Sequence, residues 1–354
     1  MNRIDGMKIG IIGTGQVASN SYLPALSKHD IELLYFNRTA EKAAACAARF
    51  GGRVCPSLAS LLAHQPDAVL LLTKETDRYD AACAALSHRP KRLFFEKPLV
   101  ARHGQGRVVE EDFEQARDLL QRARAAGTET AMVFNYRFFD HILRARAWVA
   151  ERDVGRPLQA VAHAHYACWS HTIDLLLHFS GPAATVAALE GCEKRGEGEF
   201  HSADRVAAIG FAGGAVGTLA GTSGASFDLP LLSVTFLYER AMLRMTDLDA
   251  QLEFFGTGEP AQERFGLPAG KTRWDQYEAS FGKAVDAYLA GVRAGAPPPV
   301  PGLAGLRELQ VEAALVRSAR EGRPVELESE FRIRDTLQQE TGGEIWTGST
   351  GSAG

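Results

Sequence analysis

The chain has 354 residues, of which 45% are hydrophobic and 23% charged, and its formal net charge is −4 at pH 7. This length favours two domains with a sizeable core. The charge gives no electrostatic case for a nucleic acid or an anionic membrane as partner. Its five cysteines include no C-x-x-C pair, and no apolar run suggests a signal peptide or a membrane span. We therefore expect a reduced, cytoplasmic protein.

Strand-like and helix-like segments alternate over the first part of the chain. Strands are expected at 7–12, 32–36, 68–73, 93–95 and 130–134, and helices at 17–27, 40–50, 57–64, 77–86 and 111–125. This alternation is typical of a parallel sheet with crossover helices. The continuously apolar run 7–12 indicates a strand that is covered on both faces.

The pattern changes after Asn135. A helix at 139–151, a strand at 158–166 and a short helix at 171–179 are followed by strands with glycine turns up to about residue 255. Such a series predicts an antiparallel sheet, often covered on one face only. Two long helices, at 274–294 and 303–320, follow it, and the glycine- and serine-rich end of the chain is expected to be flexible.

The segment Gly13-x-Gly15-x-x-Ala18 lies between a predicted strand and a predicted helix. Its glycines permit a tight turn and let backbone N–H groups approach a pyrophosphate at the start of the helix. This context favours dinucleotide binding over a purely structural turn.

The second strand ends in Asn37, Arg38 and Thr39. An acidic residue here would bind the 2′-hydroxyl of NAD, whereas neutral and cationic groups suit the 2′-phosphate of NADP. The alternative is that Thr39 caps the next helix while Arg38 is solvated. The two interpretations are compatible, and NADP is favoured over NAD.

The apolar strand around Phe95 ends in Glu96-Lys97-Pro98. Lysine is rarely buried unless it is paired, and the carboxyl ends of parallel strands line the ligand crevice. A lysine there can bind a substrate hydroxyl or carbonyl oxygen and steady charge as hydride moves. The alternative is an ordinary surface lysine.

Several histidines follow. His171 and Asp174 share one face of a helix start, which suggests a general acid–base histidine with Asp174 orienting it or fixing the helix start; a structural histidine is the alternative. His163 and His165 share one face of a strand, but no ligand spacing completes a metal site, so none is expected. Cys168 is interpreted as a small hydrophobe.

Together these segments resemble the Gfo/Idh/MocA family, named after glucose–fructose oxidoreductase, inositol dehydrogenase and the rhizopine-catabolism oxidoreductases. The resemblance covers nearly the whole chain and includes Gly13-Thr-Gly15, Glu96-Lys97-Pro98-Leu99, Asn135-Tyr-Arg-Phe138, His171-x-x-Asp174-Leu and Ser318-Ala-Arg-Glu-Gly-Arg-Pro-Val325.

The resemblance implies a fold and a division of the chain. An α/β Rossmann domain would span residues 1–135, and an α+β domain with a large, mostly antiparallel open sheet would span 136–340, with a flexible tail at 341–354. The active site would lie between the domains, and the sheets would pair subunits into homodimers or homotetramers. Family members oxidise or reduce sugar and cyclitol hydroxyls with NAD or NADP, and their motif lysine and histidine fall on Lys97 and His171.

The sequence departs from the family pattern at several positions. The usual aspartate before the histidine is Ala167, and Cys168-Trp169-Ser170 replaces the usual glycines. Lys74 stands where a proline is usual, Arg78 stands where a histidine is often found, and an extra loop covers 101–110. These changes indicate an atypical substrate pocket.

We therefore predict an NAD(P)-dependent oxidoreductase that prefers NADP and transfers hydride at a hydroxyl or carbonyl carbon of a sugar, cyclitol or related polyol. His171 would be the acid–base group and Lys97 would polarise the reacting oxygen, with Tyr136 or Tyr166 as the next candidates. Expected cofactor contacts are Gly13, Thr14, Gly15, Gln16, Val17, Asn37, Arg38, Thr39, Thr73, Glu96 and Lys97, and expected substrate contacts are Asn135, Arg137, His165 and Asp174.

The missing carboxylate at Ala167 keeps other functions open. One is a cofactor-binding sensor or regulatory protein that has lost catalysis. Another is a changed reaction, either imine reduction or a redox-assisted glycoside cleavage in which the cofactor is recycled.

Overall fold

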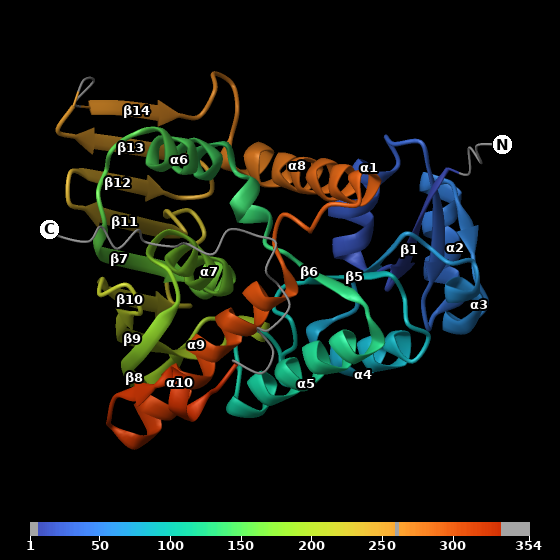
Figure 1. Ribbon diagram of the computed structural model, residues 1–354, viewed down its shortest axis with the longest axis horizontal. Coiled ribbons are helices and arrows are strands. Elements are labelled where there is room, and N and C mark those ends of the chain that lie inside the picture. Colours follow the sequence, from blue (N-terminus) through green and yellow to red (C-terminus); the bar gives the residue numbers. More distant parts are fainter. Residues whose placement is uncertain (1–5, 259–261, 334–354) are drawn as a thin grey trace, which may run out of the picture.

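A computed structural model describes residues 6–258 and 262–333 of the chain. Two sheets stand side by side and are joined by long helices (Figure 1). The predicted flexible tail at 341–354 lies outside the described residues. None of the helices within the described ranges is long and apolar enough to cross a membrane.

The N-terminal sheet has six parallel strands in the order β3-β2-β1-β4-β5-β6. They are β1 (Met7–Ile12), β2 (Ile31–Phe36), β3 (Arg53–Val54), β4 (Ala68–Leu71), β5 (Arg92–Glu96) and β6 (Glu129–Val133). Their crossover helices are η1 (Ala18–Tyr22) running into α1 (Leu23–Leu26), α2 (Ala40–Phe50), α3 (Leu58–Ala63), α4 (Glu75–Leu86) and α5 (Glu110–Ala126). This is the strand order of a dinucleotide-binding Rossmann fold, with its ligand crevice where the order reverses between β1 and β4.

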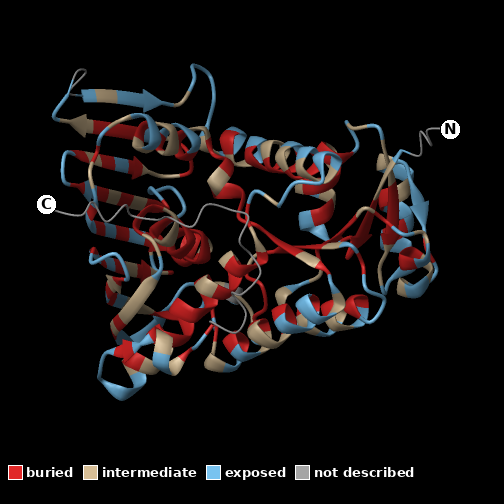
Figure 2. Cartoon of the chain, viewed as in Figure 1, coloured by how far each residue is buried: buried red, intermediate tan, exposed pale blue. Residues whose placement is uncertain are grey.

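The apolar character of β1 follows from its central place in this sheet. Ile9 and Ile11 are fully buried, since helices cover both faces of the strand. Figure 2 shows buried residues along the middle of both sheets and exposed residues on the outer helix faces. The sheet core thus forms as the continuous hydrophobic run predicts.

The second sheet has nine strands in the order β14-β13-β12-β11-β7-β10-β9-β8-β15. They are β7 (Pro157–His165), β8 (Ala183–Arg195), β9 (Ser202–Phe211), β10 (Val216–Thr222), β11 (Leu232–Tyr238), β12 (Ala241–Thr246), β13 (Gln251–Gly256), β14 (Gln262–Gly266) and β15 (Val325–Glu326). All neighbouring strands are antiparallel except β7 and β10, which run parallel. The predicted α/β plus mostly antiparallel architecture is confirmed.

Helices cover one face of this second sheet. They are α6 (Asp140–Glu151), α7 (Trp169–Ser180), α9 (Gly302–Glu321) and the short α10 (Leu327–Glu330). Short η segments precede α6 and α7: η2 (Asn135–Phe138) and η3 (Tyr166–Cys168). A further one, η4 (Gly198–Phe200), lies between β8 and β9.

The two long C-terminal helices return to the N-terminal sheet. The helix α8 (Arg273–Ala294) lies along α1 (Figure 1), and α9 packs against α5 and β6, where Met132 N donates to Val300 O at 3.1 Å. The domain division at residue 135 stays a prediction, and the two sheets share these helices across it.

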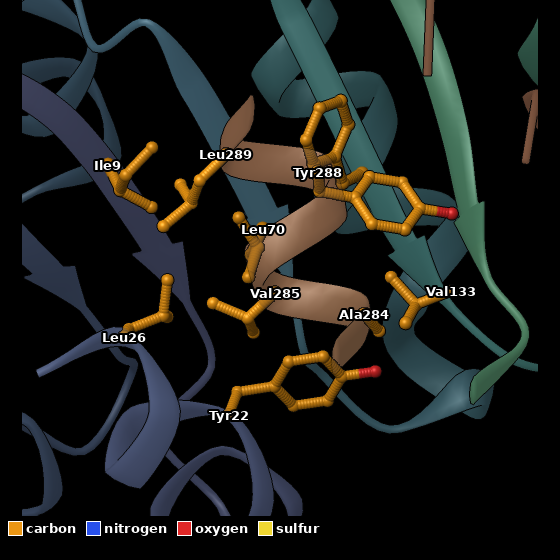
Figure 3. A pocket seen from close by; sticks show the side chains of 10 residues that line it. Ile9, Tyr22, Leu26, Leu70, Val133, Ala284, Val285, Tyr288 and Leu289 are labelled. Atoms are coloured by element: carbon orange, nitrogen blue, oxygen red, sulfur yellow. The ribbon is translucent and has the colours of Figure 1, made fainter. Parts of the chain in front are cut away.

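A small apolar cavity of about 20 Å³ lies between α8 and the N-terminal sheet (Figure 3). It is lined by Ile9, Tyr22, Leu26, Leu70, Phe94, Val133, Ala284, Val285, Tyr288 and Leu289. Both tyrosine hydroxyls are already used, because Tyr22 donates to Glu96 and Tyr288 donates to the Met132 carbonyl. With no converging polar groups, this cavity is a packing gap and not a catalytic site.

The predicted elements agree with the structure to within a few residues. The expected helix at 40–50 coincides with α2, and the expected helix at 303–320 lies within α9. The two-residue strands β3 and β15, the outer strand β14 and the short helix α10 were not predicted, because such short segments carry no hydrophobic period.

Candidate active site

The glycine turn follows β1. Gly13 has a φ of +93°, and its amide donates to the Phe36 carbonyl at 3.0 Å, so the turn is tied to the end of β2. A Cβ atom on Gly13 would lie 2.7 Å from the backbone nitrogen of Thr73, so no larger residue fits. Around Gly15 there is open space, and Gln16 and Val17 are exposed at the start of the helix.

Two buried hydroxyls beside this turn lack partners. Neither Thr14 Oγ1 nor Thr73 Oγ1 has a hydrogen-bond partner within the described part of the chain. Buried polar groups are normally satisfied, and an orphaned one points to a missing ligand. The turn, its open side and these hydroxyls therefore fit a dinucleotide cofactor, which Gly13, Thr14, Gly15 and Thr73 would hold.

The end of β2 is arranged differently from the sequence expectation. The Asn37 side chain contacts backbone at both ends: its Oδ1 accepts from Thr14 N at 3.1 Å, and its Nδ2 donates to Thr39 O at 3.0 Å. Thr39 occupies the N-cap position of α2, but its side chain makes no capping hydrogen bond. Arg38 is 82% exposed and pairs with Asp77 at 2.5 Å. Arg38, the charged residue among the three, is thus exposed to solvent beside the turn.

Arg78 holds the lysine segment in place. Its buried guanidinium donates to Thr73 O at 2.8 Å, to Glu96 O at 2.7 Å and to the carbonyl of Pro98. These bonds tie the segments that follow β4 and β5 to one another. In the sequence analysis Arg78 appeared only as a departure from the family pattern. Its place on the sheet-facing side of α4 could have indicated that it binds the ends of the strands.

Lys97 lies at the end of β5 and is partly buried. Its Nζ donates to Gln105 Oε1 at 2.8 Å. The neighbouring Glu96 is buried and accepts the Tyr22 hydroxyl at 2.8 Å. Burial raises the pKa of Glu96, and the nearby charges of Lys97 and Arg78 oppose that rise. The contact to Gln105 was not predicted.

His171 lies in α7 and is 2% exposed. Its ring stacks on Tyr136 with centroids 3.8 Å apart and planes 9° apart, and its Nδ1 has no hydrogen-bond partner among the described residues. Burial and the nearby charge of Lys97 lower the pKa of His171 well below its ordinary value. His171 is therefore a neutral imidazole, and Lys97 is near enough for its charge to act on the ring.

Asp174 does not orient His171. Its carboxylate accepts two hydrogen bonds from Arg137, at 2.8 and 2.6 Å, and this buried pair joins η2 to α7. The hypothesis that Asp174 positions the imidazole is therefore wrong for this structure: a guanidinium is the stronger partner for a buried carboxylate. Arg137 and Asp174 thus satisfy one another.

Two more of the predicted substrate residues are buried. The Asn135 Nδ2 donates to Ser280 Oγ at 2.9 Å, while its buried Oδ1 has no partner in the described ranges. His165 accepts from Ala167 N at 3.0 Å, and its ring meets Phe227 at 4.5 Å. His163, two residues earlier, is exposed. No group of three or more potential metal ligands is found in the described part of the chain.

Large side chains stand where η3 runs into α7. Cys168 is 3.2 Å from the Tyr136 hydroxyl, and burial raises its pKa to about 11, so it is a neutral thiol. Trp169 packs against Gly221, where a Cβ atom would lie 2.3 Å from the indole ring. The indole Nε1 donates to Glu312 Oε2 at 3.1 Å.

Glu308 and Glu312 lie one turn apart on α9, and both are buried. Burial and the neighbouring Glu312 raise the pKa of Glu308, and burial raises the pKa of Glu312 to about 7. Two adjacent buried carboxyls cannot both ionise, so the pair retains a proton at neutral pH. Sequence reasoning missed this pair, since glutamate on a long helix is ordinarily solvated.

We expect this pair to make stability depend on pH. The pKa of Glu312 is higher in the folded protein than in the unfolded chain. The stability of the fold is therefore full below about pH 4.5, where the carboxyl is protonated in both states, and part of it is lost as the pH rises to about 7. A double variant, Glu308→Gln with Glu312→Gln, removes the cost of ionisation. Urea unfolding should show wild-type stability falling between about pH 4.5 and 7 by up to about 3 kcal/mol more than that of the double variant. If the free energies of unfolding of the wild type and the double variant change in parallel with pH, this prediction is wrong.

Comparison with known proteins gives the family. A family model described as "Oxidoreductase family, NAD-binding Rossmann fold" (GFO_IDH_MocA) matches residues 7–134, and the model of its C-terminal alpha/beta domain matches residues 162–327. No curated protein sequence gives a significant match.

Solved structures match over most of the chain. An oxidoreductase from Agrobacterium radiobacter, in complex with NAD+, L-tartaric acid and magnesium, has a TM-score of 0.76 at 16% identity and covers 92% of this chain and 99% of its own. The WlbA dehydrogenase from Bordetella pertussis, with NADH and UDP-GlcNAcA, has a TM-score of 0.72 at 22% identity, with 91% and 97% covered. A levoglucosan dehydrogenase, with NADH and levoglucosan, has a TM-score of 0.76 at 16% identity, with 91% and 99% covered. At these identities the likeness shows the fold.

Proposed function

The chain belongs to the Gfo/Idh/MocA family of NAD-binding oxidoreductases, and we propose that it is a dehydrogenase acting on a hydroxyl carbon of a sugar, cyclitol or related polyol. The observation that supports the proposal is the neutral His171, whose Nδ1 has no hydrogen-bond partner among the described residues and whose pKa is lowered by burial and by the nearby charge of Lys97. Similar folds that are solved with UDP-GlcNAcA or levoglucosan support a sugar-like substrate.

The chemistry assigned to these residues is a proton transfer coupled to hydride transfer. When bound, a nicotinamide would supply the hydride acceptor. In the oxidation direction the substrate hydroxyl proton would pass to His171 as the C–O bond becomes a carbonyl. A general base must be unprotonated to accept it, and the lowered pKa of His171 supplies that form. The Lys97 ammonium stabilises negative charge that develops on the reacting oxygen.

Replacing Lys97 tests this assignment. We expect Lys97→Ala to lower kcat by at least about 100-fold, since it removes a charge aimed at the reacting oxygen. Cofactor binding, followed by NAD(P)H fluorescence, should be retained. Lys91→Ala, in an exposed residue just before the same strand, is the matched control. Wild-type turnover in Lys97→Ala on a substrate found by screening polyols and sugars would refute the role of Lys97. If the wild type binds the cofactor but turns over none of the polyols and sugars, the alternative of a cofactor-binding sensor or regulatory protein would be favoured.

The cofactor preference forms part of the proposal. The exposed Arg38 guanidinium at the end of β2 suits the 2′-phosphate of NADP, although Asp77 competes for it.

We expect Arg38→Ala to raise KM for NADP by about 10-fold or more, because a charge-assisted hydrogen bond contributes about 1.5–3 kcal/mol. KM for NAD should change little. The control is Arg49→Ala, on the exposed face of α2. Steady-state kinetics with both cofactors decide the question, and an equal change with NAD and NADP would contradict the preference.

A homodimer or homotetramer is likewise proposed. The face of the second sheet opposite its helices exposes apolar side chains: Val161, Leu189, Val206 and Val216, which are each at least 53% exposed. Leu189 and Val206 are direct partners across β8 and β9, so the patch is continuous there. A second copy of the chain would cover it.

We expect the variant Leu189→Asp with Val206→Asp to be monomeric, because charges on this face oppose its burial. Light scattering measures the mass, and circular dichroism checks the fold. Leu143→Asp, which alters an exposed apolar residue of α6 outside the sheet, should leave the mass unchanged. A monomeric wild type, or a variant with wild-type mass, would exclude this interface.

A reducing, cytoplasmic location completes the proposal. All five cysteines are free, including the exposed Cys192. A protein of an oxidising compartment would ordinarily pair such residues.

A further inference from the structure

The loop between β5 and α5 contributes a side chain to the site. Residues 101–109 form the part of this loop that leads into α5, and from it the amide oxygen of Gln105 accepts a hydrogen bond from Lys97 Nζ at 2.8 Å. We propose that Gln105 is a positioning residue, which holds the Lys97 ammonium toward the substrate oxygen without neutralising its charge. This inference rests on the proposed function of Lys97.

The loop is held at both ends by one buried carboxylate. Asp112, at the start of α5, is fully buried and accepts from Arg102 N at 2.8 Å and from Val109 N at 2.9 Å. These bonds join the two ends of the loop to the same side chain. The loop therefore has a defined path, and Gln105 lies near its middle.

A second acidic residue fixes the centre of the loop. Glu75, at the start of α4, accepts from Gln105 N at 3.3 Å through its side chain and from Ala101 N at 3.3 Å through its carbonyl. The backbone of Gln105 is thus attached to the helix that also carries the Arg78 clamp. Residues of α4 therefore hold both partners of the Lys97–Gln105 contact: Arg78 binds the backbone on either side of Lys97, and Glu75 binds the backbone of Gln105.

The neutral amide matters because of the charge around Lys97. A carboxylate partner would form an ion pair and compete with a developing oxyanion for the ammonium. Ala167 provides no such carboxylate, and Glu96 is hydrogen-bonded to Tyr22. The Gln105 amide oxygen accepts one N–H of Lys97 and carries no charge. The ammonium therefore keeps its positive charge, and its other two N–H groups can donate to substrate.

The test uses two substitutions of Gln105 in the full-length protein. Gln105→Ala should lower kcat by about 10- to 100-fold with KM for the cofactor unchanged, since a hydrogen bond from a charged donor is lost. Gln105→Glu should move the basic limb of the pH–rate profile upward by about one unit or more relative to wild type. Nitrogen NMR of ¹⁵N-lysine-labelled protein reports the chemical shift of Lys97 Nζ, which should change in Gln105→Ala, and Lys97→Ala assigns the signal.

Arg107→Gln is the control, because Arg107 is an exposed residue of the same loop. It should keep wild-type kcat and pH profile. If both Gln105 variants behave like Arg107→Gln, the positioning role is overturned. If Lys97→Ala itself retains turnover, the proposed function of Lys97 fails, and the chemical shift of Lys97 Nζ in Gln105→Ala still decides the contact: an unchanged shift overturns the contact, and a changed one supports it.

Discussion

The arrangement of the site depends on the buried guanidinium of Arg78. It binds three carbonyls, at Thr73, Glu96 and Pro98, so it fixes the ends of β4 and β5 relative to each other. The first of these segments closes against the glycine turn, and the second presents Lys97. A buried arginine is costly to desolvate, and the three carbonyls offset that cost while satisfying acceptors that the strand ends leave open. One side chain thereby links the cofactor side of the crevice to the catalytic side.

The buried charges around this clamp are arranged so that Lys97 meets few competitors. Arg137 is paired with Asp174, Arg273 with Asp247, and Glu308 and Glu312 retain a proton between them. His171 is neutral and Cys168 is a thiol. In a low-dielectric interior the charge that lacks a neutralising partner dominates the local field. The ammonium of Lys97 is hydrogen-bonded to a neutral amide, and its charge also acts on the neighbouring Glu96; in the proposed mechanism it stabilises an anionic transition state.

Patterns in the sequence predicted the elements and the family well, because strands buried on both faces and capped helices leave local signals. The glycine turn and Lys97 were found for the same reason: each lies at the end of an apolar strand. Partners from distant segments were missed. Nothing near His171 in sequence indicates that Asp174 binds Arg137, since that choice depends on how η2 packs against α7. The links from Gln105 to Lys97 and from Trp169 to Glu312 are likewise tertiary, and periodicity carries no information about them.

The departures from the family pattern form a connected set, and this favours a changed pocket over a lost activity. Trp169 stands where a glycine is usual, and Gly221 on the facing strand leaves room for its ring. The carboxylate missing at Ala167 is matched by an amide that reaches Lys97 from the extra loop. The buried Nδ1 of His171 has no hydrogen-bond partner in the described ranges, which costs about 1–3 kcal/mol, and a ligand in the crevice could satisfy it. A functional site often places residues that the local sequence pattern does not favour, and neighbouring residues then change to accommodate them. The proposed redox role of Lys97 therefore involves a set of neighbours that differs from the family pattern.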